Sequence, residues 1–369
     1  MNETKYCKGC GIALQSSNSE GLGYILEKHI EIGKCKRCFR IQQYSDFQVV
    51  DIKNEELYEM MDAIVATDAY IIHMLDITDL LGSAIFEASA SLKKKPCLIV
   101  VNKIDVIDRN MRRYDHWHEY CSEIFAKHGI KVKDILFVSA KEILGIQFLL
   151  KYLKKEAGNK PIHIIGSANV GKSSLIQAFF QENGLETKQT PIISPIPGTT
   201  LKALEIQCSD FTLFDTPGIM KPQQFTYHLQ PSALKEVTLL KQIRPRNYPI
   251  YEEQTFFIGG YAQINIKPKG TNSVTFYMNQ QLEIHRRKTA GSDDFFKTHL
   301  GGILSPPYAE NGVIDEKFFN RATTIIKVKQ AKTDIVISGL GWISIKNSDV
   351  EVEVITLPKV MIYKKNALV

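Results

Sequence analysis

The segment GSANVGKSSL (residues 166–175) constrains the fold of this chain more than any other feature. It fits the pattern GxxxxGK[ST], follows an apolar run over 161–168 that predicts a strand, and precedes a predicted helix. A phosphate-binding loop requires this context, because backbone N–H groups of the loop and of the helix N-terminus must face the phosphates. The match predicts an α/β domain that binds a nucleotide at this turn.

Individual residues of this loop have predicted roles. Lys172 is expected to reach the β- and γ-phosphates, and Ser173 is expected to bind Mg²⁺. The residues of the loop expected to contact the nucleotide are Gly166, Ser167, Ala168, Asn169, Val170, Gly171, Lys172, Ser173 and Ser174.

Two further segments fit phosphate sensors. The sequence DTPG (215–218) follows the apolar stretch FTLF, where Asp215 can hold Mg²⁺ through water and the Gly218 N–H can meet the γ-phosphate. Between the two motifs lies PIPGTT (195–200), in which Thr200, or less readily Thr199, would give Mg²⁺ its second protein oxygen.

Two segments upstream of the loop fit guanine recognition. NKID (102–105) ends a predicted strand, and the Asp105 carboxylate can accept hydrogen bonds from guanine N1–H and the exocyclic amine. Adenine lacks that pair of donors and would leave the carboxylate unpaired, so the site discriminates strongly. Lys103 can pack its stem along the base, and the Ala140 N–H can meet guanine O6. The residues predicted to contact the base are Asn102, Lys103, Asp105, Ser139, Ala140 and Lys141.

The order of these motifs is unusual. Each short match alone could be an ordinary strand-to-helix turn, but all four lie at predicted strand ends in one consistent cyclic order. In ordinary GTPases the order along the chain is the phosphate loop, the threonine loop, DxxG and then the base-reading segments, whereas in this chain the base-reading segments come first. We therefore predict one circularly permuted P-loop GTPase domain, with YLKKEAGNK (152–160) bridging the old ends, because permutation leaves the carboxyl ends of the strands in place.

Patterning divides the chain into three parts. Residues 1–50 are short, polar and cysteine-bearing. The predicted GTPase domain covers 51–228, where continuous apolar strands alternate with helices, as in a mostly parallel sheet covered on both faces. The part over 229–369 is predicted to begin with a helix (231–243) and a linker (244–249). It then forms a β-rich domain, because its apolar residues alternate with a period of two.

The seven cysteines are expected to be thiols or metal ligands rather than cystines. No apolar run approaches the roughly 20 residues that span a bilayer, and the N-terminus lacks the apolar stretch of a signal peptide. We therefore expect a cytoplasmic protein in a reducing environment, with no membrane partner. Cys97, Cys121 and Cys208 lie in strand or helix patterns and are interpreted as buried thiols.

The other four cysteines predict a structural zinc finger. They form two CxxC pairs separated by 24 residues, and two such turns complete a tetrahedral site. A redox CxxC or a coincidence is the alternative, although no βαβ pattern surrounds the pairs. Four thiolates leave no open position, so this zinc would not be catalytic. The predicted ligands are Cys7, Cys10, Cys35 and Cys38.

The basic residues are unevenly distributed. Residues 221–369 carry 20 Lys and Arg against 13 Asp and Glu, whereas residues 1–220 carry 26 against 27. Such an excess is compatible with a nucleic-acid partner and is equally common on solvated surfaces. HRRK (285–288) and three lysines are candidates for phosphate contacts, or else belong to solvated strand faces; the lysines are Lys327, Lys329 and Lys332.

These motifs, together with DIVISGLGW (334–342) in the β-rich part, closely resemble the YqeH family of circularly permuted GTPases over essentially the whole chain. The resemblance implies a GTPase that acts in assembly of the small ribosomal subunit. It implies binding to ribosomal RNA or to the maturing particle, and no DNA partner is expected. The alternative is a GTP-regulated adaptor that binds a protein through the β-rich domain. A metabolic enzyme regulated by GTP is not favoured, because the sequence shows no second group of catalytic residues beyond the nucleotide site.

The sequence lacks one residue that many GTPases use for hydrolysis of GTP. After DxxG, where many GTPases place a water-orienting Gln, stands Ile219. Turnover is therefore either slow until a partner binds, or assisted by another electrostatic device. Asn169 is the candidate, because an Asn at this loop position resembles that of potassium-activated GTPases; the alternative is that it only stabilises the loop. The predicted catalytic set is Lys172, Asn169, Thr200 and Gly218.

The phosphate-sensing segment also suggests a switch. It runs within about a dozen residues from Gly218 into the predicted helix and the basic domain. Our hypothesis is that the γ-phosphate orders residues 216–228 and reorients that domain, which would couple nucleotide state to RNA affinity.

Overall fold

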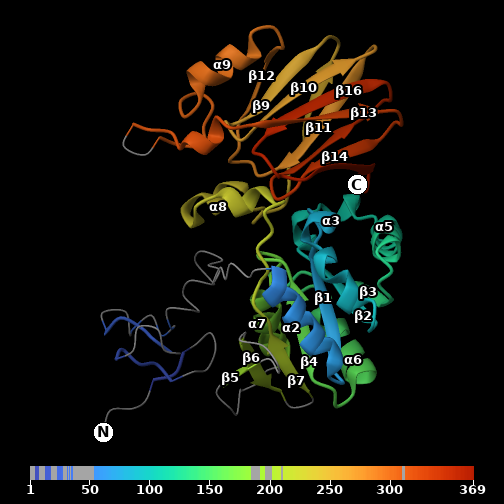
Figure 1. The fold of residues 1–369 in the computed structure, drawn as a ribbon, viewed down its shortest axis with the longest axis vertical. Coiled ribbons are helices and arrows are strands. Elements are labelled where there is room, and N and C mark those ends of the chain that lie inside the picture. Colours follow the sequence, from blue (N-terminus) through green and yellow to red (C-terminus); the bar gives the residue numbers. More distant parts are fainter. Residues whose placement is uncertain are drawn as a thin grey trace. The chain divides into compact units, whose positions relative to one another are not determined.

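The chain forms two compact units in a computed structural model (Figure 1). One comprises Met1–Asp105 with Tyr114–Met220, and the other comprises Val106–Arg113 with Lys221–Val369. The residues that the structure describes are 5–7, 13–17, 23–27, 31, 33, 35, 54–183, 192–195, 202–208, 211–309 and 312–369.

A seven-stranded sheet with the order β3-β2-β1-β4-β7-β6-β5 forms the centre of the first unit. The first five strands in this order are parallel, and β6 and β5 run antiparallel at one edge. The strand that leads into the phosphate loop, β4, lies between β1 and β7. The strands are β1 (Tyr70–Asp76), β2 (Cys97–Asn102), β3 (Val132–Phe137), β4 (Ile162–Gly166), β5 (Ile192–Pro195), β6 (Lys202–Gln207) and β7 (Thr212–Asp215).

Helices cover both faces of this sheet. On one face, α6 and α7 bury leucines and aromatic residues against alternate strand residues, such as Leu153 and Phe179 against Ile72 and Ile164. On the other face, the adjacent residue His73 meets Phe125 of α5 with ring centroids 5.3 Å apart. None of the described helices has both the length and the apolar character needed to cross a membrane. The helices are α2 (Asn54–Ala66), α3 (Leu80–Ser83), α4 (Ser89–Leu92), α5 (Tyr114–Lys127), α6 (Ile146–Ala157) and α7 (Lys172–Asn183).

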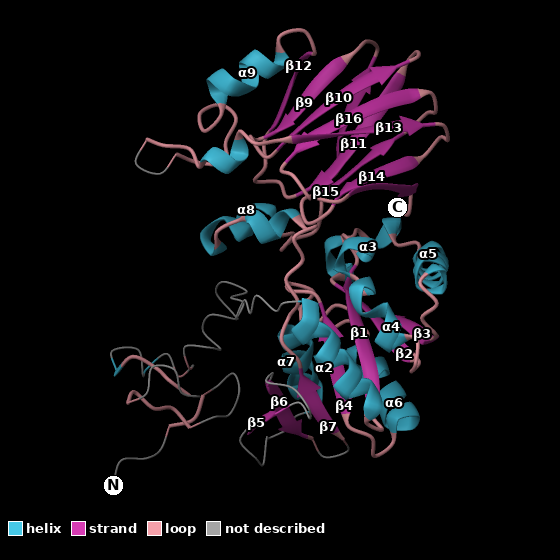
Figure 2. Cartoon of the chain, viewed as in Figure 1, coloured by secondary structure: helices cyan, strands magenta, loops and turns pink. Residues whose placement is uncertain are grey.

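Two five-stranded antiparallel sheets make up most of the second unit (Figure 2). Their orders are β12-β9-β10-β16-β13 and β17-β14-β15-β11-β8, and residues of both sheets share one apolar core. The strands are β8 (Arg246–Ile250), β9 (Gln254–Ile258), β10 (Ala262–Pro268), β11 (Asn272–Met278), β12 (Ile284–Lys288), β13 (Ala322–Val328), β14 (Thr333–Ile337), β15 (Gly341–Ile345), β16 (Val350–Thr356) and β17 (Ile362–Asn366). The helices are α8 (Leu234–Val237) and α9 (Ser292–His299).

The structure corrects two expectations at the start of this unit. The helix expected over 231–243 is a 3-10 turn followed by the four-residue α8. It ends early because the Asn279 amide donates to the carbonyl oxygens of Lys235 and Thr238, at 3.1 and 2.7 Å. The linker expected over 244–249 largely forms β8. Its Pro249 is tolerated because β8 is an edge strand, where a missing N–H breaks no central ladder.

Candidate nucleotide-binding site

Strand register brings the predicted nucleotide motifs to one edge of the sheet. Asp76 at the end of β1 pairs with Asn102 at the end of β2. Across β4, Met74 pairs with Gly166 and Ile164 pairs with Asp215. Because these strands are parallel, their carboxyl ends form a common edge, which is where open α/β sheets bind ligands. Base readers and phosphate motifs far apart in the chain therefore meet there.

The phosphate loop has the backbone that the motif requires. Asn169 and Gly171 adopt positive φ angles of 70° and 96°. At Gly171 a Cβ atom would clash with the amide nitrogen of Asn102, so this position must be glycine both for its φ angle and for the close approach of the base-reading loop. The loop and the guanine-reading segment are thus packed directly against each other.

Lys172 is held inside the loop. Its Nζ donates to the carbonyl oxygens of Gly166 and Ser167, both at 2.9 Å. Burial lowers the pKa of this ammonium to about 8, while the nearby Asp215 carboxylate acts to raise it. A buried cation fixed by two carbonyls is preorganised for the phosphate charge that the motif predicts beside it.

Ser173 and Asp215 fit the predicted magnesium site. The Ser173 hydroxyl donates to Asp215 Oδ2 at 3.3 Å, so two hard oxygen ligands lie next to each other at the start of α7 and the end of β7. Mg²⁺ takes octahedral oxygen ligands at about 2.0–2.1 Å, and neighbouring oxygens at this separation suit it. Thr200 and Thr199, predicted to give Mg²⁺ its second protein oxygen, lie outside the described residues.

The DxxG segment lies on the phosphate loop. The Ala168 N–H donates to the Ile219 carbonyl at 2.8 Å, and the Ile219 N–H donates to the Gly166 carbonyl at 3.3 Å. A Cβ atom at Gly218 would lie 3.1 Å from Lys172 Nζ and 3.2 Å from Ala168 Cα. Only glycine brings the backbone this close to the lysine, as expected for a γ-phosphate sensor.

Asn102 connects the two halves of the site. Its Nδ2 donates to the Val170 carbonyl at 2.8 Å, and its Oδ1 accepts from the Ala140 N–H at 2.9 Å. The Ala140 N–H, predicted to meet guanine O6, is therefore engaged by Asn102 in this structure. Ser139 donates to Asp105 Oδ1 at 2.7 Å, which orients the carboxylate expected to read guanine.

One residue of this edge, Asp76, is missed by motif reasoning. Its Oδ2 forms an ion pair with Lys103 Nζ at 2.6 Å. Its Oδ1 accepts from the Thr78 N–H and hydroxyl at 2.9 and 2.7 Å. Its position in the sequence could have indicated this role, because Asp76 ends one predicted strand and Lys103 follows the next predicted strand.

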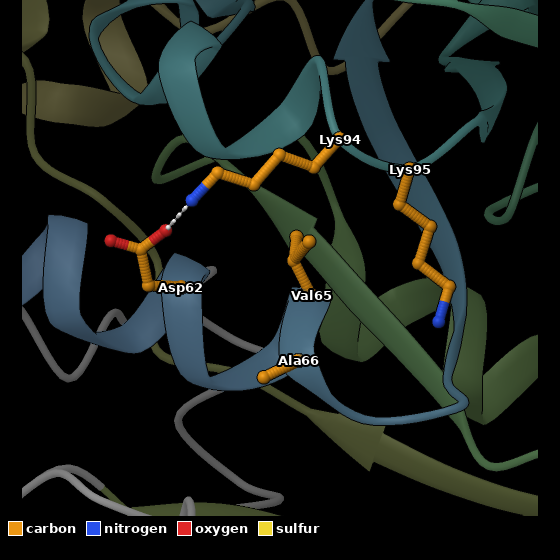
Figure 3. A pocket seen from close by; sticks show the side chains of 5 residues that line it. All are labelled: Asp62, Val65, Ala66, Lys94 and Lys95. Atoms are coloured by element: carbon orange, nitrogen blue, oxygen red, sulfur yellow. Dashed lines mark hydrogen bonds and ion pairs between the residues drawn. The ribbon is translucent and has the colours of Figure 1, made fainter.

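A separate hollow of about 590 Å³ lies elsewhere on the first unit (Figure 3). Lys94 and Lys95 on its wall precede β2, so it belongs to the amino ends of the strands, opposite the nucleotide motifs. Lys94 is already paired with Asp62 at 3.0 Å, and Lys95 Nζ donates to the Thr67 carbonyl. The hollow lies away from the nucleotide motifs, and none of their described residues lines it.

The predicted zinc ligands are described in part. Cys7 and Cys35 are buried, and the Cys35 N–H donates to Cys7 Sγ at 3.2 Å, so one cysteine of each CxxC pair lies beside one of the other pair. Cys10 and Cys38 lie outside the described residues, and within the described residues no three His, Cys, Asp or Glu side chains gather as metal ligands. The remaining cysteines divide: burial raises the pKa of both Cys97 and Cys121 to about 12, whereas Cys208 is half-buried.

The fold and the nucleotide edge define the class of protein. A phosphate loop on the central strand, DxxG on one neighbour and the base readers on strands earlier in the chain make this a circularly permuted P-loop GTPase, which binds and hydrolyses GTP. Two family models match: one described as "50S ribosome-binding GTPase" over residues 161–256, and one described as "YqeH-like, C-terminal" over residues 271–368.

Whole-chain relatives identify the family. The protein YqeH of Bacillus subtilis is 31% identical over 373 residues, covering 100% of both chains. This chain belongs to the YqeH family.

More distant relatives share less of their length. The chloroplastic GTP-binding protein Brassinazole Insensitive Pale Green 2 of Arabidopsis thaliana is 27% identical, over 86% of this chain and 53% of its own length. GTPase Der of Mycoplasma mycoides is 29% identical over 59% of this chain and 50% of its own. The solved structure of YjeQ from Thermotoga maritima matches with a TM-score of 0.28 and 20% identity over 46% of this chain and 55% of that chain, which is too low to support an inference.

Proposed function

We propose that this GTPase is a nucleotide-switched assembly factor of the small ribosomal subunit, which binds ribosomal RNA or the maturing particle in the cytoplasm. The observation that carries the proposal is the position of one of the three chain boundaries between the two units. It falls between Met220 and Lys221, two residues after Gly218 of the predicted phosphate-sensing segment. A change at Gly218 thus reaches the second unit through a very short connection.

The segment after this boundary is anchored in the second unit. Phe225 is fully buried in the core of the two sheets. Its N–H donates to the Ser338 carbonyl at 2.7 Å, and the Met361 N–H donates to the Gln223 carbonyl at 2.8 Å. Residues 221–228 therefore move with the sheets. This supports the switch hypothesis, in which the γ-phosphate acts on Gly218 and the basic unit responds.

The residues of the site would have different roles in GTP hydrolysis. Lys172 and the Gly218 N–H would face the transferred phosphate, and Ser173 and Asp215 would hold Mg²⁺, which when bound neutralises charge on the phosphates. Ile219 offers no side-chain hydrogen bond to a water. We therefore expect slow intrinsic turnover.

The Asn169 side chain supports a potassium site, which would be a further source of positive charge for GTP hydrolysis. Its side-chain Oδ1 is buried and accepts no hydrogen bond from the residues that the structure describes. A buried oxygen of this kind at the phosphate loop fits a monovalent cation, whose charge would assist departure of the phosphate. We include K⁺ in the proposal on this basis.

The structural zinc remains part of the proposal, and the contact between Cys7 and Cys35, one cysteine from each CxxC pair, supports it. Metal analysis of the purified chain should find one zinc, lost in Cys7→Ser and kept in Cys208→Ser. GTP hydrolysis should be unchanged in both, since four thiolates form a closed site. Wild-type chain without zinc would contradict this part.

Sedimentation with isolated ribosomal subunits tests the function. We expect the protein to sediment with the small subunit more strongly with a non-hydrolysable GTP analogue than with GDP. Equal affinity in both nucleotides would contradict the switch. Preference for the large subunit would favour the partner named in the description of the matching GTPase family, and absence of binding to either subunit would favour the GTP-regulated adaptor.

A further inference from the structure

Lysines from four separate segments lie at or near the hairpin that joins β13 to β14 in the second unit. All six are exposed. We call this set the lysine end: Lys269, Lys327, Lys329, Lys332, Lys346 and Lys364.

Backbone contacts hold these segments together. The Lys269 N–H donates to the Asp349 carbonyl at 3.1 Å, and the Asp349 N–H donates to the Val328 carbonyl at 2.8 Å. The Lys332 N–H donates to the Lys346 carbonyl at 3.0 Å. On the remaining side, Lys364 Nζ lies 3.4 Å from the carbonyl oxygen of Lys327. The lysine end is therefore one surface built by the fold.

The lysine end carries more lysines than nearby carboxylates among the described residues. Among the residues that the structure describes, none of the six lysines forms an ion pair, although Asp349 and Glu351 are exposed nearby. In the first unit, by contrast, Lys94, Lys103 and Lys160 each pair with an aspartate. With Asp349 and Glu351 counted, the lysine end keeps an excess of positive charge, which creates a local positive potential.

The arginines of the other basic candidate, HRRK in β12, contact residues of the second unit itself. Arg286 donates to Gln254 and to the Pro249 carbonyl, at 2.6 and 2.7 Å. The Arg287 guanidinium stacks over the Phe295 ring at 4.2 Å. These arginines hold β12 and α9 in place, so the structure favours the lysine end over this strand as the surface for a partner.

We propose that the lysine end binds the phosphate backbone of RNA. This inference rests on the proposed ribosomal function and assigns its RNA contact. Lysines act as point charges for phosphates, and backbone binding requires no base-specific side chain. A membrane surface fits less well, because interfacial binding needs penetrating apolar groups. No exposed large apolar side chain of the described residues lies in the loops at 269–271, 329–332 or 346–349.

Two full-length variants with the same change in charge test the proposal. The first changes Lys329, Lys332, Lys346 and Lys364 to Gln. The control changes four exposed lysines elsewhere in the unit, Lys241, Lys288, Lys297 and Lys359, to Gln. Binding of a labelled RNA of about 30 nucleotides is followed by fluorescence anisotropy over a series of KCl concentrations. Thermal unfolding and GTP hydrolysis should match wild type in both variants, since none of these residues lies in the nucleotide site.

We expect the first variant to bind RNA on the order of 10²-fold more weakly and to lower the salt slope by about 3, whereas the control stays within about threefold of wild type. Equal weakening in both variants, or none in the first, would overturn the proposal. Polyglutamate binding as tight as RNA, and lost in the same variant, would overturn it in favour of an acidic protein partner. Failure of wild type to sediment with ribosomal subunits would instead contradict the proposed function.

Discussion

Asp76 lies outside the recognised nucleotide motifs, yet its carboxylate holds Lys103, the residue expected to pack along the guanine base. We expect Asp76→Asn to raise the Kd for GTP about tenfold, because a hydrogen bond to a charged group contributes about 1.5–3 kcal/mol and Lys103 would lose its fixed position. Titration with a fluorescent GTP analogue measures this change.

Asp62→Asn is the matched control for Asp76→Asn. It removes an aspartate–lysine pair from the same unit, but the pair with Lys94 is exposed and lies on the opposite edge of the sheet. Exposed pairs contribute about 0–1 kcal/mol, so GTP affinity should not change. Equal Kd values for Asp76→Asn and wild type would show that other contacts position Lys103.

Asn169 decides whether the loop also recruits a cation. We expect hydrolysis in KCl to exceed hydrolysis in matched NaCl, and we expect Asn169→Gly to remove this stimulation. Glycine is the right test, because φ at this position is 70° and glycine adopts it without strain. Equal rates in the two salts, or full K⁺ stimulation in the glycine variant, would contradict the assignment.

His163 makes the stability of the first unit depend on pH. It is 6% exposed and stacked on Phe214, and burial, assisted by the charge of Lys95, lowers its pKa to about 4. The unfolded chain, with a His pKa near 6.5, binds more protons between about pH 4 and 6.5. The contribution of this group is therefore complete above pH 6.5 and is lost as the pH falls towards 4.

Urea unfolding at a series of pH values measures this effect. Between about pH 6.5 and 4, wild type should lose on the order of 2–3 kcal/mol more stability than His163→Phe, which keeps the ring stack and removes the titrating group. Parallel pH profiles for the two proteins would show that His163 is not the group responsible.

At the scale of elements, the buried ring of Phe225 anchors the segment after Lys221 together with two backbone hydrogen bonds. Phe225 is fully buried, and we expect Phe225→Ala to destabilise the second unit by about 3–5 kcal/mol in urea unfolding. Phe319→Ala should cost less than about 0.5 kcal/mol, because Phe319 is 50% exposed. Similar losses in both variants would contradict an anchoring role for Phe225.

Other elements show why local sequence patterns were insufficient. A helix over 231–243 satisfies helical periodicity, but the Asn279 side chain, far along the chain, donates to the carbonyls of Lys235 and Thr238 in the middle of this segment. The segment 244–249 contains two prolines and resembles a linker, but pairing with β11 makes most of it the edge strand β8. In both cases a tertiary partner decides between local alternatives of similar free energy.

At the scale of the whole molecule, the short connection from Gly218 to the second unit predicts that nucleotide coupling depends on its length. We expect a Gly-Ser-Gly-Ser insertion between Met220 and Lys221 to leave GTP affinity unchanged and to abolish the difference in subunit binding between GDP and a GTP analogue. Sedimentation measures this difference. The same insertion after Gly158, which faces open space, should keep the coupling. Retained coupling in the first insertion would contradict transmission through this connection.

The nucleotide chemistry of this protein could be predicted from sequence alone, because each motif is a short contiguous stretch whose backbone and side chains are expected to meet the ligand directly. The sequence also determined the permuted order, since cyclic order is a property of the chain. Only the tertiary structure decided which distant side chains meet. The pairing of Asp76 with Lys103, the internal use of Arg286 and Arg287, and the gathering of six lysines at one end of the sheets depend on strand pairing between segments far apart. No local pattern encodes such contacts, because they form only when the sheets assemble.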